Sequence, residues 1–338
     1  MTYPEPLKKS TFLGVFGPSA GVVGVEPSKQ LTKSYRNVGR LGFRIRELNS
    51  ARACKQLVGA TAKVRSDELN YLFQSDEVSG IMTPWSGDLA MDMLPLVDFE
   101  KLGRFGATWI CGNGDVTALL LAITLICDYA TIHGTDMMSL GYGKIHEFDL
   151  KVFEAMTKSE LIQSSSPVRG NPVKWSESEA SPYELDQPSA WKMMQTGVSA
   201  NFNGRMIGGC LEAIRDLIGT PYAPVPKFIE KYAHDGIIWV LDSDSMSAPE
   251  VYKALWQMRE AGWFKSVTGF LLGRSSKCAS KNDFHFIDAL EQALGKLNAP
   301  VIYDADIGRV PPRIQIVNGA LGRVEFSNGI AMVRQWYR

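Results

Sequence analysis

A sharp turn between an expected strand and an expected helix is the strongest candidate for a chemical role. The β-rich run 109–111 enters Gly112-Asn113-Gly114-Asp115, and a helical stretch follows. Hydrolases place a nucleophile at such a turn, because the turn exposes one side chain and aims helix-start N–H groups at a developing oxyanion. The exposed position here is Gly114, which has no side chain, so the glycines could also serve backbone geometry alone.

The same glycines could form half of a dinucleotide-binding motif. They follow an expected strand and open a helix whose N-terminus could hold a pyrophosphate group. The third glycine position of that motif is Thr117, and no acidic residue closes a following strand about twenty residues further on. We therefore expect no nucleotide cofactor.

The cysteines and histidines are weaker candidates. Cys111 precedes the turn and should point into the core, so we interpret it as a buried apolar residue. Cys210 follows a pair of glycines and is a better candidate for a reactive thiol. The histidines are scattered without metal-ligand spacing, and only His146, in a glycine loop, merits a test as an acid/base group. We expect no metal site.

The order of motifs resembles the family of LD-carboxypeptidases and microcin C immunity (MccF-like) carboxypeptidases, which are cytoplasmic serine peptidases with a Ser/Glu/His triad. The resemblance covers almost the whole chain and implies a two-domain fold with a cleft and a homodimer. The matching residues include Gly17-Pro18-Ser19, Ile81-Met82, Leu94-Pro95-Leu96-Val97-Asp98, Asp115, Thr117-Ala118-Leu119-Leu120, Gly204-Arg205, Gly208-Gly209, Asp242-Ser243 and Asp304-x-Asp306.

The residues at the family's catalytic positions cannot carry out its reaction. The resemblance places the elbow serine at Gly114 and the histidine at Arg309. It places the glutamate directly before the aspartate matched by Asp242, which makes that position Leu241. Glycine has no nucleophile, leucine cannot orient a base, and an arginine stays protonated near neutral pH. In the family, the backbone of two successive glycines helps form the oxyanion hole. The matching residues here are Ser86 and Gly87, so only one of the two glycines is kept.

Other polar residues lie on segments that converge on the cleft in this family. Guanidinium groups beside carboxylates suit a zwitterionic or carboxylate-bearing ligand, although each aspartate could equally cap or brace a loop. Trp85 in the glycine loop and Trp175 in the linker could stack on a planar ligand group or pack their own loops. The charged candidates are Asp115, Asp242, Asp244, Asp304, Asp306, Arg309 and Arg313.

These replacements leave two functional classes open. One is an enzyme whose cleft has turned to non-hydrolytic chemistry on a small amino-acid-derived or peptidic molecule, and the other is a binding protein without turnover. The alternative is an active LD-carboxypeptidase or MccF-like hydrolase carrying an inactivating glycine, but three replaced positions favour natural divergence. We hypothesise that Arg309 pairs with Asp304 or Asp306, or binds a ligand carboxylate in the room left at Gly114.

The elements that must position these residues alternate between strands and helices, which predicts a mostly parallel α/β sheet covered on both faces. Residues 204–218 read as a glycine turn that leads into a helix. Residues 164–203 are rich in Ser, Pro and Glu. We therefore expect an N-terminal α/β domain over 1–165, which contains the elbow-like turn. A crossing linker over 166–200 and a smaller C-terminal α/β domain over 201–338 follow it.

The composition is that of an ordinary globular protein. The chain has 338 residues, with 36 basic and 36 acidic side chains and 45% hydrophobic residues. This balance predicts no general affinity for nucleic acid or for an acidic membrane. No apolar run reaches the roughly 18 residues of a membrane span, and the N-terminus lacks the apolar core of a secretory signal. With five widely spaced cysteines, the chain is expected in the cytoplasm with reduced thiols.

Overall fold

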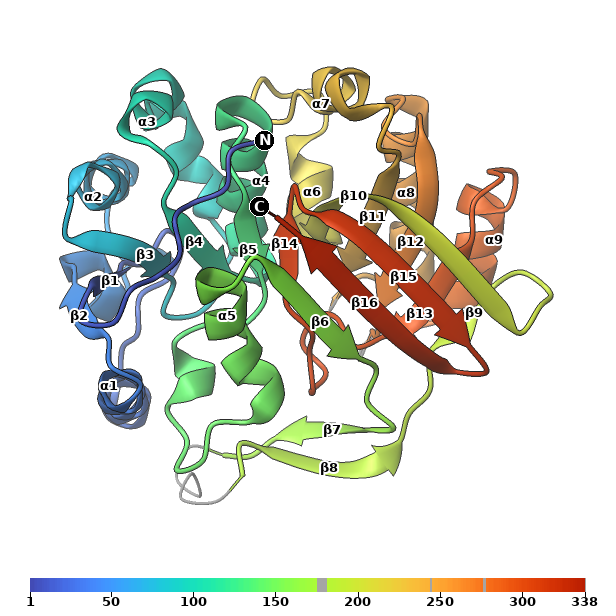
Figure 1. The fold of residues 1–338 in the computed structure, drawn as a ribbon. Helices are drawn as coiled ribbons and strands as arrows, with labels where there is room; N and C mark the ends of the chain where they lie inside the picture. The colour runs from blue at the N-terminus through green and yellow to red at the C-terminus, as the bar shows by residue number, and fades with distance from the viewer. Residues whose placement is uncertain (175–180, 244, 276–277, 338) are drawn as a thin grey trace.

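The computed structural model describes residues 1–174, 181–243, 245–275 and 278–337. Two β-sheets lie side by side, with helices packed between and around them (Figure 1). The N-terminus and the end of the described chain both lie near the junction of the two sheets. In the described part of the chain, no helix is both long enough and apolar enough to cross a membrane.

The first sheet is the mostly parallel sheet that the sequence predicts. In the described chain it has six strands in the order β14-β5-β4-β3-β1-β2, and only β14 runs antiparallel to its neighbour. Its central strands are buried apolar runs, as expected where helices cover both faces. The strands are β1 (Phe12–Val15), β2 (Arg44–Glu47), β3 (Val78–Met82), β4 (Trp109–Gly112), β5 (Thr131–His133) and β14 (Ile316–Asn318).

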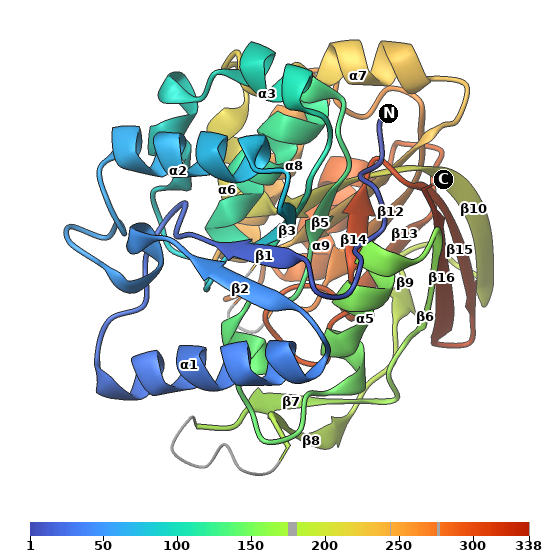
Figure 2. The same cartoon turned by 60° about the vertical axis from the view of Figure 1, so that its left-hand side comes forward.

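Helices cover both faces of this sheet (Figure 2). The cluster of buried residues on one face includes side chains of α2, α3 and α4, and the cluster on the other face includes side chains of α1 and α5. The helices are α1 (Val25–Arg40), α2 (Ala62–Gln74), α3 (Phe99–Phe105), α4 (Thr117–Ala122) and α5 (Glu147–Thr157).

The second sheet is mixed and contains eight strands in the described chain. Its order is β6-β16-β15-β10-β11-β12-β13-β9, with the run from β10 to β13 parallel. The strands are β6 (Glu160–Ser164), β9 (Lys192–Met193), β10 (Ser199–Cys210), β11 (Ile237–Asp242), β12 (Val267–Gly273), β13 (Val301–Ala305), β15 (Leu321–Ser327) and β16 (Ile330–Trp336). The helices are α6 (Leu211–Leu217), α7 (Val225–Tyr232), α8 (Ala248–Glu260) and α9 (Phe286–Leu294).

The two halves of the chain exchange strands across the boundaries expected from the sequence. β6 lies within 1–165 but joins the second sheet, whereas β14 lies within 201–338 but joins the first. The expected linker contains a separate hairpin, β7 (Val168–Pro172) with β8 (Tyr183–Pro188), and the second sheet is the wider of the two. One cluster of buried residues, which includes Leu119, Ile214 and Trp239, joins both halves. The two halves therefore share a core.

The glycines of residues 204–210 form a strand, so the expected glycine turn was wrong. They belong to the second half of β10, and α6 begins only at Leu211. A β-carbon on Gly208 would lie 1.7 Å from the Val240 carbonyl oxygen, and one on Gly209 would lie 2.6 Å from the Thr117 side chain. The glycines thus allow neighbouring segments to approach closely, which a sequence pattern does not distinguish from a turn.

Candidate functional site

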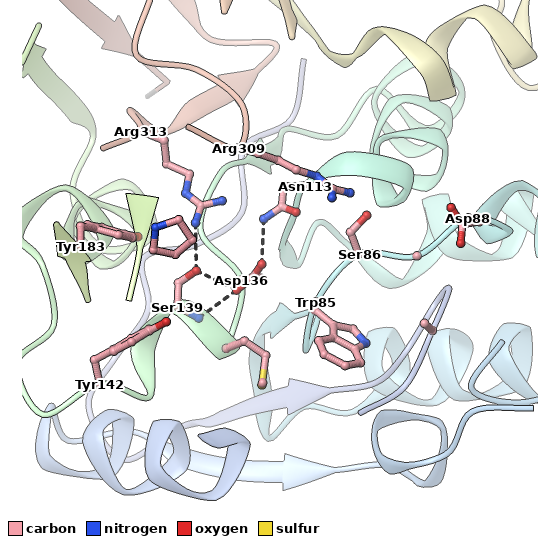
Figure 3. Close-up of a pocket in the computed structure, with 14 residues that line it drawn as sticks. Trp85, Ser86, Asp88, Asn113, Asp136, Ser139, Tyr142, Tyr183, Arg309 and Arg313 are labelled. Carbon is pink, nitrogen blue, oxygen red and sulfur yellow. Dashed lines mark hydrogen bonds between the residues drawn. The ribbon is translucent and has the colours of Figure 1, made fainter. Parts of the chain in front are cut away.

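A pocket of about 570 Å³ lies at the carboxyl edge of the first sheet (Figure 3). The loops after β1, β3, β4 and β5 form its walls, and the turn after β13 of the second sheet faces them. Parallel strands end on one edge of a sheet, so these loops converge there and leave a crevice. The lining residues are Ala20, Trp85, Ser86, Gly87, Asp88, Asn113, Asp136, Met138, Ser139, Tyr142, Pro172, Tyr183, Arg309 and Arg313.

The strand-to-helix turn predicted at Gly114 is present between β4 and α4. Gly114 has a φ of 55°, in the left-handed region that favours glycine. A β-carbon built on Gly114 would lie 2.3 Å from the Ser86 hydroxyl oxygen and 3.7 Å from Arg309 Nη2. The Ser86 oxygen also accepts a hydrogen bond of 2.9 Å from the Asp115 N–H. The Ser86 hydroxyl therefore fills the space in front of the turn.

The Asp115 carboxylate fixes the loops around this turn. Its Oδ2 accepts hydrogen bonds from the Ser19 hydroxyl at 2.6 Å and from the Ala90 N–H at 2.7 Å. Burial raises the pKa of Asp115, although these two donors oppose the shift. Gly87 packs closely against Ser19, because a β-carbon at position 87 would lie 2.3 Å from the Ser19 hydroxyl oxygen. Asp115 is therefore placed to brace the loops.

A polar cluster forms another wall of the pocket. Asp136 accepts hydrogen bonds of 2.9 Å from the Ser139 N–H and hydroxyl, and one of 3.0 Å from the Asn113 side-chain amide. Arg313 Nη2 lies 3.1 Å from the Ser139 hydroxyl, to which it donates. Figure 3 shows this chain of contacts running from Arg313 through Ser139 and Asp136 to Asn113. The wall thus presents a carboxylate beside a guanidinium.

Arg313 stays charged because acidic groups surround it. Burial alone would lower its pKa, but contact with the Tyr183 hydroxyl oxygen and attraction to the Asp136 and Asp149 carboxylates raise the pKa above the usual value of arginine. Asp149 is fully buried and accepts hydrogen bonds from Tyr183 at 2.6 Å and from Thr135 at 2.9 Å. These contacts connect β8 of the hairpin to the first domain at the pocket wall.

Arg309 lines the pocket from the turn after β13, and it is exposed rather than buried. Its guanidinium extends toward Ser86 and Asn113 (Figure 3). The two aspartates expected to border it have other cationic partners. Asp304 lies 2.8 Å from Lys192 Nζ and does not line the pocket, and Asp306 forms an ion pair with Arg274. Asp304 is therefore not placed to contact a ligand in this pocket.

Leu241 and Asp242 end β11 with opposite orientations. Leu241 is buried in the cluster of apolar residues that joins both halves. Asp242 faces the other way, and a β-carbon on Gly308 would lie 3.1 Å from its Oδ2. His133 Nε2 lies 2.8 Å from Asp242 Oδ1, and both side chains are buried. The structure therefore sets Asp242, not Leu241, beneath the turn that carries Arg309.

The remaining sequence candidates divide between the pocket and other regions. Trp85 lines the pocket together with Met138 and Tyr142. Trp175 and Asp244 lie outside the described residues. His146 caps α5 and lines a different cavity. Among the described residues, no group of three or more His, Cys, Asp or Glu side chains could hold a metal ion.

Both cysteine candidates are buried, and burial raises the pKa of each thiol. The interpretation of Cys111 as a core residue is confirmed. We expect iodoacetamide to modify the exposed Cys54 in the folded protein well before Cys111 or Cys210, because the thiolate is the reactive form. Peptide mass spectrometry over time measures the order. Early alkylation of Cys210 would restore it as a nucleophile candidate.

Several pocket residues have no signal in the sequence. Asp136 lies in a loop, Ser139 in the short 3-10 helix Met138–Leu140 and Tyr183 on the linker hairpin, and apolar periodicity gives no register in segments this short. His133 does not line the pocket but lies 2.8 Å from Asp242, and the sequence pattern does not single it out, although it ends β5 and is followed by Gly134. A polar residue at the end of a buried parallel strand is the signal that would have identified it.

Comparison with known proteins identifies two family models along the chain. The LD-carboxypeptidase N-terminal domain matches residues 13–134, and the LD-carboxypeptidase C-terminal domain matches residues 203–324. A protein of Vibrio cholerae named as a carboxypeptidase is 25% identical over 97% of this chain and 96% of its own.

Solved structures share the fold. An MccF-like protein from Bacillus anthracis superposes with a TM-score of 0.86 at 19% identity, covering 100% of both chains. The microcin C7 self-immunity protein MccF of Escherichia coli is 22% identical over 98% of this chain and 95% of its own. A structure of MccF in complex with aspartyl sulfamoyl adenosine gives a TM-score of 0.82 at 20% identity, over 99% of this chain and 98% of that one.

Proposed function

Because the chain belongs to the LD-carboxypeptidase family, we propose that it keeps the family's cleft but not its serine-peptidase chemistry. The cleft then binds a small amino-acid-derived or peptidic molecule that carries a carboxylate. The proposal rests on one observation: Ser86 and Arg309, which line the pocket, both lie within 4 Å of the place where a side chain at Gly114 would begin.

The loss of hydrolysis follows from the groups at this point. Gly114 supplies no nucleophile, and a guanidinium at Arg309 cannot take a proton near neutral pH. Among the described residues that line the pocket there is no histidine. His133 is 3% exposed and lies beneath the elbow helix, where its Nδ1 is 3.3 Å from the Thr117 hydroxyl. A serine at this pocket would therefore lack the base that makes serine a nucleophile.

We infer that Asp242, rather than Leu241, holds the place of the family's glutamate. Alternate residues of a strand face opposite sides of a sheet, so only one of the two can face the turn at Gly308. The contact between Asp242 and Gly308 supports Asp242. On this inference the acid of the triad is retained as an aspartate, while the nucleophile and the base are replaced.

The pocket offers separate surfaces for the two ends of the ligand. The Arg309 guanidinium can bind a carboxylate with two parallel hydrogen bonds. Trp85, Tyr142 and Met138 offer apolar and aromatic surface nearby, and the Asp136 carboxylate lies on the wall between. A ligand built from an amino acid has a carboxylate, a polar main chain and a side chain to match these surfaces. The MccF complex with aspartyl sulfamoyl adenosine supports this class, because that ligand is also built from an amino acid.

The test is binding of matched pairs of compounds. We expect ligand-observed NMR to detect binding of members of a panel of N-acetyl amino acids and dipeptides, and not of their C-terminal amides, because the amides lack the charge that Arg309 recognises. Binding of acids and amides alike, or of no member, would contradict the proposed ligand class.

Long incubation of the same panel separates the two functional classes. An enzyme with changed chemistry changes the mass or the configuration of a bound compound, whereas a binding protein returns it unaltered. Mass spectrometry and chiral chromatography report these two outcomes.

We also propose the homodimer that the family resemblance implies. One face of the second sheet exposes Ile330, Leu321 and Ile162, which strand pairing places on the same side. The same face carries the charged side chains of Arg323, Glu325 and Arg334, and a mixture of exposed apolar and charged residues can form a protein interface. Light scattering is expected to give twice the chain mass of 37.3 kDa. A monomer at micromolar concentration would contradict this.

A further inference from the structure

We propose that Ser86 has taken over the space of the elbow side chain and is a specificity-determining residue of the pocket. Its oxygen accepts a hydrogen bond from the N–H group of Asp115, the residue after the elbow position. Its hydroxyl proton is donated to the ligand carboxylate that Arg309 binds. The steric part of this inference is independent of the proposed function, whereas the ligand contact rests on it.

The steric argument is that residues 86 and 114 cannot both carry a side chain in this conformation. A β-carbon on Gly114 would lie 2.3 Å from Ser86 Oγ and 3.0 Å from Ser86 Cβ. Ordinary contact between heavy atoms begins near 3.5 Å, so the first distance is a clash and the second is a tight contact. A side chain at position 114 therefore forces the Ser86 hydroxyl to rotate out of this place and the two β-carbons to move apart by a few tenths of an ångström, and a glycine at position 86 removes both contacts.

The hydrogen-bond argument concerns the direction of the Ser86 hydroxyl. A serine hydroxyl has one proton to donate and two lone pairs. The Asp115 N–H donates to the oxygen at 2.9 Å, which uses one lone pair. No acceptor among the described residues takes the hydroxyl proton, and Ser86 lines the pocket. The proton is thus available to a ligand, on the side where the Arg309 guanidinium lies.

The same contact explains which ligand state the pocket favours. In a hydrolase with a nucleophile elbow, the N–H after the nucleophile stabilises the oxyanion of the tetrahedral intermediate. Here that N–H already has the Ser86 oxygen as its acceptor. An oxyanion could reach the N–H only by displacing Ser86, whereas a planar carboxylate can be held by Ser86 and Arg309 without any displacement. The pocket therefore favours the intact acid over the hydrolytic intermediate.

A double-mutant cycle tests the steric part without any ligand. We expect Gly114→Ser to lower the melting temperature by roughly 5 °C, and the double variant Gly114→Ser/Ser86→Gly to recover much of that loss. Gly219→Ser is the matched control, since Gly219 also has a positive φ of 85° but nothing within 4 Å of its β-carbon position. The control measures backbone strain alone. A Gly114→Ser loss no larger than that of Gly219→Ser, or one unchanged by Ser86→Gly, would overturn the steric part.

Binding of the N-acetyl amino acid panel tests the ligand contact. We expect Ser86→Ala to weaken binding roughly fivefold while Ser86→Thr, which keeps the hydroxyl, restores most of the affinity. Equal affinity of Ser86→Ala and the unaltered protein, together with a loss in Arg309→Ala, would overturn the Ser86 contact but leave the proposed function standing. Absence of binding in the unaltered protein would instead overturn the proposed function. Covalent labelling of Ser86 by a fluorophosphonate would show a nucleophile and overturn the binding role.

Discussion

Replacing Arg309 with alanine is expected to weaken binding of the carboxylate ligand between about tenfold and a hundredfold. A hydrogen bond to a charged group contributes about 1.5–3 kcal/mol, which corresponds to this range of affinity. Arg309 is exposed on the pocket turn, so its loss should leave the melting temperature nearly unchanged. Isothermal titration calorimetry with the tightest member of the N-acetyl amino acid panel measures the affinity, and calorimetric melting measures the stability.

Two further variants make this result specific to the guanidinium. Arg309→Lys keeps the charge but loses the two parallel donors, so its affinity should fall between that of Arg309→Ala and the unaltered protein. Arg323→Ala removes an exposed arginine of β15 that does not line the pocket and should have no effect on binding. A lower melting temperature with unchanged affinity in Arg309→Ala would show that Arg309 is structural.

Replacing Asp306 with alanine should lower the free energy of unfolding by about 3–5 kcal/mol, because it leaves the buried charge of Arg274 without its partner. Arg274 is 2% exposed and Asp306 is fully buried. Arg274 also donates to the Pro312 carbonyl at 2.9 Å, and Asp306 accepts from the Ser166 N–H at 2.6 Å. This ion pair therefore holds the turn that carries Arg309, and urea denaturation measures its contribution.

The control for this variant is an ion pair of similar type on the surface. Arg46 of β2 lies 2.6 Å from Glu77, and the Glu77 side chain is 62% exposed. Glu77→Ala should change the free energy of unfolding by less than about 1 kcal/mol. If Asp306→Ala were as mild as this control, the ion pair would not be what fixes the turn.

The sequence predicts the features that depend on local pattern and on the succession of strands and helices along the chain. The alternation of apolar runs predicts the parallel sheet, and the run from Trp109 to Asp115 predicts the turn at Gly114. The sequence does not predict that β14 joins the first sheet, because the pairing of distant strands cannot be recognised in the pattern of either segment alone. Nor does it distinguish the close-packed glycines of β10 from a turn.

The site shows how a small shift in register changes a functional assignment. Matching the family's glutamate to Leu241 or to Asp242 differs by one residue, yet a one-residue shift in a strand moves a side chain to the opposite face. The short distance between Asp242 and the backbone of Gly308 supports the assignment to Asp242 that we propose. The resemblance places Ser86 at the site, but its contact with Gly114 is not visible in the sequence, because residues 86 and 114 meet only when two strands of the sheet end side by side.

The most direct test of the central claim is an assay of C-terminal amino acid release from LD-linked muropeptides and peptidyl adenylates, run with and without a serine-directed phosphonate. The protein encoded by the native gene should be used, so that the glycine at position 114 is known to be natural. We expect no release above background, and intact mass spectrometry should show no phosphonate adduct. Steady turnover that the phosphonate abolishes would contradict the account and return the chain to the serine carboxypeptidases.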